Sequence, residues 1–293
     1  MEIEEILSSS QVREVMKNGG SIMVIGDTNT GKTTLCQFLI KMASGMKRGF
    51  LDFDIGQSTY LPGTLNAYYE WKEKSESAHY FVGSISPSGV IPEVLRGVFQ
   101  LKKWLLERDV DFIAIDTTGY INTPEAISLK ESKIKILSPD LIIVLAWGDI
   151  LPVIKETILT FTKNFLIATP SSKVKARGPE ERRRYREALF RLYFENAVIR
   201  QLDVPLHSDG RNENFSKGRL TGLLDGCGFM LSSGIISSFE RGKVEILTPY
   251  SQDMTKIKFI KLGNLIVNPK TGEHKTLPNH SNCENNLLDI TIL

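Results

Sequence analysis

The sequence predicts an α/β fold: a doubly wound, mainly parallel sheet with helices on both faces, and then a small C-terminal β-rich domain. Three observations lead to this prediction. An apolar run at 21–25 precedes a glycine-rich loop, GDTNTGKT, at 26–33. Strand-like and helix-like patterns then alternate as far as about residue 170. From 197 onward, short strand-like runs separated by Gly and Pro replace that alternation. Alternating strands and helices are typical of a parallel sheet whose ligands bind at the carboxyl ends of the strands.

The elements of the first domain follow from local patterns. Residues 1–18 place apolar side chains at helical spacing, which predicts an N-terminal helix. The runs at 111–116 and 141–147 are almost continuously apolar, as expected for parallel strands covered on both faces. The predicted strands are 21–25, 49–54, 111–116, 141–147 and 164–168, and the predicted helices between them are 34–45, 92–108, 124–137 and 150–160.

The change in pattern along the chain predicts its domain organisation. The predicted parts are an N-terminal helix at 1–20, a nucleotide-binding domain at 21–196 that includes an arginine-rich segment at about 171–196, a β-rich domain at 197–278 and a polar tail at 279–293. In the β-rich domain, TGLLDG, FMLSSGIISSF, KVEILTPY and IKFIKLGNLIVNP read as strands.

Composition excludes several classes of protein. The chain has 293 residues, of which 41% are hydrophobic and 24% charged, as in an ordinary globular protein. No run approaches the roughly 20 apolar residues of a membrane span, so no membrane association is expected. The acidic start, MEIEE, is unlike a signal peptide. Three cysteines without metal-ligand spacing favour a reduced, cytoplasmic protein.

The loop at 26–33 matches the G-x-x-x-x-G-K-[ST] pattern of nucleoside triphosphate-binding P-loops, between a strand and a helix as such loops require. Its glycines let backbone N–H groups point at a β-phosphate, and the helix that follows contributes its positive dipole end. Lys32 is expected to reach the β- and γ-phosphates, and Thr33 to offer its hydroxyl to Mg²⁺. The expected nucleotide-binding residues are Gly26, Asp27, Thr28, Asn29, Thr30, Gly31, Lys32, Thr33 and Thr34.

Two acidic segments follow other strands of the same sheet. In DFDIGQS, Asp54 can hold Mg²⁺ through water or accept a proton from an attacking hydroxyl, and Gln57 can orient that nucleophile. In FIAIDTTGY, Asp116 occupies the Walker B position and Tyr120 can stack on a nucleobase. The sequence leaves open whether Asp54 or Asp116 is the base or the metal-side carboxylate.

The segment 171–196 carries eight lysines and arginines. It follows the last predicted strand of the sheet, where nucleotide kinases commonly place a lid. Arginines held over the γ-phosphate stabilise the charge of the transferred group. A helix is expected from Tyr185 onward, with Arg177 in the loop before it.

Together these motifs resemble the polyribonucleotide 5′-hydroxyl-kinase family, whose members act in tRNA splicing, rRNA processing and mRNA 3′-end cleavage. The P-loop is followed by the family's Asp-x-x-Gln element (Asp54, Gln57), its Thr-x-Gly-aromatic clasp (Thr117, Gly119, Tyr120) and its arginine-rich lid, in the same order. The resemblance covers most of the chain. Relatives commonly carry tryptophan where this chain has Tyr120.

The resemblance implies a role for each matching residue. Asp54 would act as base and help to hold the water shell of the metal, while Tyr120 would contact a terminal base. The implied catalytic residues are Lys32, Asp54, Arg177 and Arg182, with Arg186 as a further lid candidate. The implied metal-site residues are Thr33 and Asp54, and the implied substrate-binding residues are Gln57, Thr117, Gly119 and Tyr120.

The expected activity is Mg²⁺-dependent transfer of the γ-phosphate of ATP to the 5′-hydroxyl end of single-stranded RNA, and possibly of DNA. Two alternatives stay open. A P-loop GTPase or ATPase switch could use Asp116 and Gly119 to sense a γ-phosphate, although the guanine-reading pattern Asn-Lys-x-Asp is absent from the sequence. The second alternative is a non-catalytic, ATP-bound RNA-processing scaffold. The use of ATP over other nucleotides is implied only by the resemblance.

Overall fold

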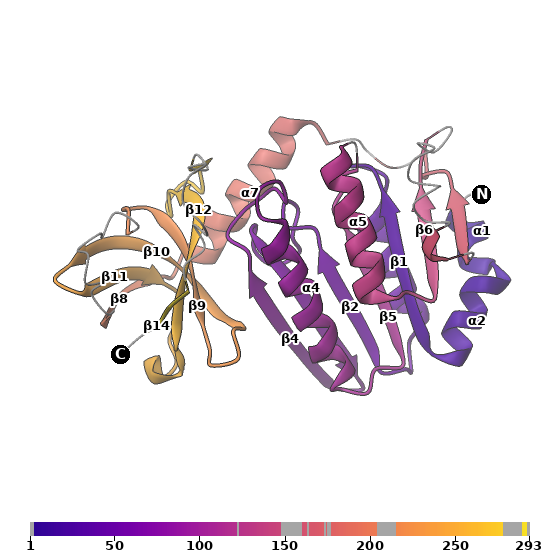
Figure 1. The fold of residues 1–293 in the computed structure, drawn as a ribbon, viewed down its shortest axis with the longest axis horizontal. Helices are drawn as coiled ribbons and strands as arrows, with labels where there is room; N and C mark the ends of the chain where they lie inside the picture. Colours follow the sequence, from indigo (N-terminus) through magenta and orange to yellow (C-terminus); the bar gives the residue numbers. More distant parts are fainter. Residues whose placement is uncertain are drawn as a thin grey trace. The chain divides into compact units, whose positions relative to one another are not determined.

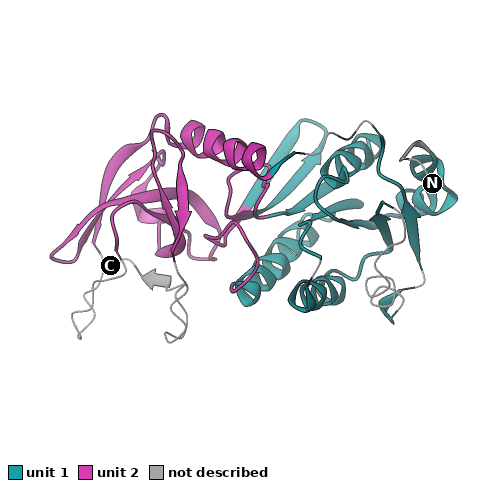
Figure 2. Ribbon diagram, turned by 90° about the horizontal axis from the view of Figure 1, so that it is seen from above, with its two compact units in different colours: residues 1–54, 65–78, 90–178 teal, residues 55–64, 79–89, 179–293 magenta. Residues whose placement is uncertain are grey.

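The computed structural model describes residues 3–121, 123–147, 160–162, 164–172, 174, 177–203, 215–277 and 289–291. The chain forms two compact units, coloured separately in Figure 2. Unit 1 comprises residues 1–54, 65–78 and 90–178, and unit 2 comprises residues 55–64, 79–89 and 179–293. The predicted boundary at 196/197 therefore differs from the observed division at 178/179, which assigns the helix of the arginine-rich segment to unit 2.

A seven-stranded sheet with the order β4-β3-β2-β5-β1-β6-β7 forms the first layer of the fold. Its strands are β1 (Gly20–Gly26), β2 (Arg48–Phe53), β3 (Thr64–Trp71), β4 (Lys74–Phe81), β5 (Phe112–Thr117), β6 (Leu141–Leu145) and β7 (Phe165–Ala168). The pairs β1–β5, β1–β6, β2–β5 and β6–β7 are parallel, whereas β3 is antiparallel to β2. The mainly parallel sheet is therefore confirmed, and all five predicted strands are present.

The strands β3 and β4 were not predicted. Residues 64–67 and Tyr69 of β3 are buried, and Lys72 adopts a positive φ of 54° in the turn that follows. Positive φ is uncommon for residues other than glycine. Because this turn lacks the Gly or Asn that usually marks a hairpin, its local signal is weak.

Helices cover the sheet of unit 1, and Figure 1 shows α4 and α5 lying over the strands. The helices are α1 (Ile3–Ser8), α2 (Ser10–Asn18), α3 (Lys32–Met42), α4 (Ile91–Leu106) and α5 (Pro124–Leu137). The single predicted N-terminal helix is two helices, because the Ser9 side chain accepts a hydrogen bond from Val12 N and caps α2. The predicted helix at 150–160 lies almost entirely outside the described residues.

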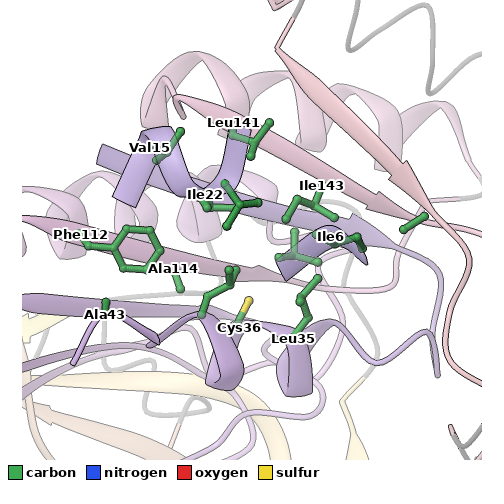
Figure 3. Close-up of a cluster of buried hydrophobic side chains, with 14 of the residues drawn as sticks. Ile6, Val15, Ile22, Leu35, Cys36, Ala43, Phe112, Ala114, Leu141 and Ile143 are labelled. Carbon is green, nitrogen blue, oxygen red and sulfur yellow. The ribbon is translucent and has the colours of Figure 1, made fainter. Parts of the chain in front are cut away.

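A buried apolar cluster holds α1, α2 and α3 against β1, β5 and β6 (Figure 3). Ile22, Phe112 and Ile143 are fully buried and point to the same side of the sheet. Leu35 and Cys36 of α3 contact this layer, and so does Ile6 of α1. The cluster thereby fixes the start of α3, and with it the loop at 26–31, relative to the ends of the strands.

Unit 2 contains a second sheet, with the order β13-β12-β9-β10-β11-β8 and β14 paired to β12. Its elements are α7 (Pro179–Phe194), β8 (Val198–Asp203), β9 (Arg219–Leu224), β10 (Met230–Glu240), β11 (Lys243–Thr248), the 3₁₀ turn η1 (Met254–Lys256), β12 (Phe259–Val267), β13 (His274–Thr276) and β14 (Asp289–Thr291). Neighbouring strands pair antiparallel. The predicted β-rich domain is confirmed, and β14 adds a short strand within the segment predicted as a polar tail.

Helix α7 begins at Pro179, six residues before the expected start at Tyr185. Proline is favourable in the first turn, where its missing N–H has no helical partner. Glu180 and Glu181 follow it and complement the positive end of the helix dipole. No helix in the described part of the chain is both long and apolar enough to traverse a lipid bilayer.

Candidate functional site: the phosphate-binding loop and its carboxylates

The phosphate-binding loop joins β1 to α3, and two of its glycines shape it. Gly31 is the N-cap of α3 and adopts a left-handed conformation with φ of 85°. Because a glycine has no side chain, the N-cap residue cannot fill the position where a phosphate would bind. At Gly26, a Cβ atom would lie 2.4 Å from the carbonyl oxygen of Leu145, so this close approach of β1 to β6 requires glycine.

Internal hydrogen bonds shape the same loop around the carbonyl oxygen of Asp27. This oxygen accepts hydrogen bonds from Thr30 Oγ1 at 2.9 Å and from Lys32 Nζ at 2.6 Å. The lysine side chain is buried, with 6% of its surface exposed. The ammonium group therefore lies over the loop, where a bound phosphate would replace the carbonyl as its partner.

A hydroxyl–carboxylate pair stands at the end of β5. Thr33 Oγ1 donates to Asp116 Oδ2 at 2.5 Å. Burial, together with the nearby negative charge of Asp52, raises the pKa of Asp116 to about 7, although Lys32 and the hydrogen bond from Thr33 act in the opposite direction. These two oxygens fit Mg²⁺, which prefers hard oxygen ligands and usually keeps few protein ligands beside nucleotide phosphates and water. No group of three or more His, Cys, Asp or Glu side chains that could hold a metal occurs among the described residues.

Asp54 follows β2, and its backbone N–H is hydrogen-bonded to the side chain of a second aspartate, Asp52. Asp52 lies opposite Asp116 in the parallel register of β2 and β5. Its Oδ1 accepts a hydrogen bond from Asp54 N at 3.1 Å, and its Oδ2 accepts one from Asn66 Nδ2 at 3.2 Å. Asp52 is buried, whereas Asp54 is partly exposed and thus accessible to a substrate. The sequence reasoning missed this role of Asp52, although the spacing of two residues in DFD was its signal.

Two lysines of α5 were also missed. Lys130 and Lys133 are buried, and they donate hydrogen bonds to the carbonyl oxygens of Thr118 and Phe53. Burial lowers the pKa of Lys130 well below its usual value and that of Lys133 to about 8. The signal in the sequence was their spacing of three residues, which puts them on one face of a helix.

The predicted clasp lies directly after β5. Thr117 is buried and its hydroxyl donates to Val24 O at 2.8 Å, so it joins β5 to β1. At Gly119, a Cβ atom would lie 2.6 Å from the backbone nitrogen of Thr28, so only glycine lets this segment approach the phosphate-binding loop. The phenol of Tyr120 donates to Glu125 Oε2 at 2.7 Å and accepts from Thr123 Oγ1 at 3.0 Å, which fixes the orientation of its ring.

One predicted lid residue lies beside the loop in unit 1. Asn29 Nδ2 donates to the carbonyl oxygen of Arg177 at 3.1 Å, and the Arg177 side chain is exposed. Gln57 and Arg182 belong to unit 2. There Gln57 Nε2 donates to Gly56 O at 2.8 Å, and Arg182 lies on α7. Unit 1 thus brings together the loop, Asp54, Asp116, the clasp and the backbone of Arg177, whereas the roles of Gln57 and Arg182 stay predictions.

Comparison with known proteins places the chain in a family. Residues 26–196 match the family described as mRNA cleavage and polyadenylation factor CLP1 P-loop. A protein of Pyrococcus horikoshii named polyribonucleotide 5′-hydroxyl-kinase is 29% identical, over 86% of this chain and 87% of its own length. A Pyrococcus furiosus protein with the same name is 36% identical, over 63% of this chain and 53% of its own.

A solved structure extends the likeness to the fold. The structure of a wild-type Clp1p–Pcf11p complex superposes with a TM-score of 0.69 at 13% identity, over 89% of this chain and 78% of that one. This agreement includes the α/β layer and most of the remaining chain. Because the family match spans more than half of the sequence, the protein belongs to the CLP1 P-loop family.

Proposed function

We propose that this protein is an ATP- and Mg²⁺-dependent kinase that phosphorylates the 5′-hydroxyl of a polynucleotide. One observation carries the proposal: a partly exposed carboxylate, Asp54, follows the strand beside the buried Asp116, which is hydrogen-bonded to Thr33. This arrangement offers one carboxylate for the metal, Asp116, and another for proton transfer, Asp54. Relatives named polyribonucleotide 5′-hydroxyl-kinase support RNA as the acceptor.

Each group of residues then has its own role in phosphoryl transfer. The amides of the loop and Lys32 hold the β- and γ-phosphates, and Thr33 and Asp116 hold the metal. Mg²⁺, when bound, neutralises phosphate charge. Asp54 accepts the proton of the 5′-hydroxyl as its oxygen attacks the γ-phosphorus in line, and Arg177 stabilises the charge on the transferred group. Free Cys36 and Cys227 suit the reducing cytoplasm, where we place this activity.

The clasp predicts a measurable role for the hydroxyl of Tyr120. Removing it in Tyr120→Phe keeps the ring but deletes the bonds to Glu125 and Thr123. We expect KM for the RNA to rise about fivefold, with kcat nearly unchanged, because a freely rotating ring must be ordered on binding. Tyr120→Leu removes stacking as well, so its KM should rise about tenfold or more. Steady-state kinetics with a short 5′-hydroxyl RNA measures both, and equal KM values for the wild type and Tyr120→Leu would contradict stacking.

The proposed function is tested by transfer of label from γ-labelled ATP with Mg²⁺. The acceptors are a short RNA with a 5′-hydroxyl, the same RNA with a 5′-phosphate and a DNA of the same sequence. Label on the 5′-hydroxyl RNA alone, or on it and the DNA, is the expected result. Label released only as inorganic phosphate, with no oligonucleotide labelled, would reject the kinase and favour a nucleotide-dependent switch. Parallel assays with GTP decide the nucleotide.

A further inference from the structure

Helix α5 carries two lysines on the face that it buries. Lys130 is 4% exposed and Lys133 is fully buried, beside the apolar Leu129, Ile134 and Leu137 of the same face. Lysines are almost never fully buried unless they are paired. Leucine or methionine would pack better at these positions, so packing alone does not explain the two charged side chains.

Each lysine holds one of the two segments that line the phosphate site. Lys133 Nζ donates to Phe53 O at 3.3 Å, and Phe53 directly precedes Asp54. Lys130 Nζ donates to Thr118 O at 2.5 Å, and Thr118 directly precedes Gly119 of the clasp. Phe53 lies opposite Thr117 in the parallel register of β2 and β5, so these carbonyl groups stand at neighbouring strand ends.

The charges around these lysines are those of the site itself. Lys133 is attracted by Asp54, Asp116 and Asp52, and Lys130 by Asp54 and Asp116. Lys130 also experiences repulsion from Lys133 and Lys32. Buried charges of opposite sign contribute little net stability, because the cost of removing them from water offsets their attraction. What the arrangement does supply is a fixed position for two strand ends whose carboxylates would otherwise repel each other.

We propose that Lys130 and Lys133 are positioning residues for phosphoryl transfer: Lys133 holds the segment of Asp54, and Lys130 holds the clasp. This inference rests on the proposed kinase function. It predicts different kinetic effects for the two lysines. Loss of Lys133 should affect kcat, because Asp54 acts on the reacting hydroxyl, whereas loss of Lys130 should affect KM, because the clasp binds the nucleic acid. Neither lysine is expected to contact the substrate itself.

Lys133→Met and Lys130→Met remove the charge and the hydrogen bond while keeping most of the side-chain volume. Lys133→Met is expected to lower kcat about 10²-fold with KM for RNA within threefold, since a displacement of about 1 Å costs that much. Lys130→Met is expected to raise KM for RNA about tenfold with kcat within threefold, as for the loss of one charged hydrogen bond. Lys135→Met, on the exposed side of α5, is the matched control and should keep both constants.

Conservative variants distinguish positioning from a general effect on folding. Lys133→Arg keeps a donor and a charge, so its kcat should exceed that of Lys133→Met about tenfold. Melting curves establish that each variant is folded, and if a methionine variant is not, the glutamine variant takes its place in the same comparison. Kinetic constants that stay equal to those of the wild type in folded variants, or the same loss of kcat in both, would overturn the proposal.

Hydrogen–deuterium exchange provides a readout that does not need activity. Lys133→Met should speed exchange in peptides covering 52–54, and Lys130→Met in peptides covering 117–121, while Lys135→Met changes neither. If the wild-type chain transfers no label, the kinase assignment fails, yet the exchange data still decide whether the lysines hold these segments. Unchanged exchange in both methionine variants would reject the positioning role whatever the activity.

Discussion

Replacing Asp54 by asparagine is expected to lower kcat for RNA phosphorylation by about 10³-fold, within the range attributed to general bases. The amide keeps the size of the side chain but cannot accept the proton of the 5′-hydroxyl. Because Asp54 is partly exposed beyond β2, whereas the buried Asp116 bonds Thr33, affinity for ATP with Mg²⁺ should change less than threefold. Single-turnover transfer assays and titration with a fluorescent ATP analogue measure the two quantities.

The variant Asp116→Asn tests the role of the second carboxylate. An amide there removes a negative ligand from the Thr33–Asp116 pair, so Mg²⁺-dependent nucleotide binding should weaken about tenfold or more. Asp109→Asn, at a surface position whose side chain is 93% exposed, is the control for loss of a charge. The opposite pattern, with nucleotide binding lost in Asp54→Asn and only turnover lost in Asp116→Asn, would exchange the roles of the two carboxylates.

The elements that the sequence predicts correctly are those determined by local signals. The strand β1, its glycine-rich loop and α3 follow from one motif whose residues are close in the chain. The buried strands β5 and β6 follow from apolar runs that parallel strands require. The hairpin β3–β4 was missed because its turn uses Lys72 at positive φ rather than a glycine. Likewise α7 starts at Pro179, within the segment expected to be a loop before Tyr185.

The part of the site that escaped the sequence reasoning depends on tertiary burial. Asp52 and Asp116 are 64 positions apart in the chain but lie opposite each other in the register of β2 and β5. Lys130 and Lys133 are charged residues in a helix, which normally marks an exposed face. Their burial follows only from how α5 packs. The hydroxyl of Thr117 donates to Val24 O, a bond across the sheet that the sequence does not reveal, and the contact of Thr117 with RNA stays a prediction.

Arg177→Ala is expected to lower kcat by about 10³-fold, the lower end of what a transition-state arginine contributes. Its carbonyl is bonded by Asn29 of the phosphate-binding loop, so the segment that bears this guanidinium is already attached beside the phosphates, while the side chain itself is exposed. Charge on the γ-phosphoryl oxygens is spread differently in the transition state than in bound ATP, so turnover should suffer far more than nucleotide affinity.

The comparison with two other arginines makes this prediction specific. Arg182→Ala should show the same kinetic pattern if Arg182 also serves the transferred group. Arg184 pairs with Glu180 on the surface of α7, with 3.3 Å between Nε and Oε1, so Arg184→Ala should keep kcat within about threefold. Arg177→Lys retains the charge but not the two-pronged geometry, and should recover only part of the loss. A fall in ATP affinity with unchanged turnover in Arg177→Ala would instead make this arginine a nucleotide-binding residue. Other residues would then have to stabilise the charge of the transferred group.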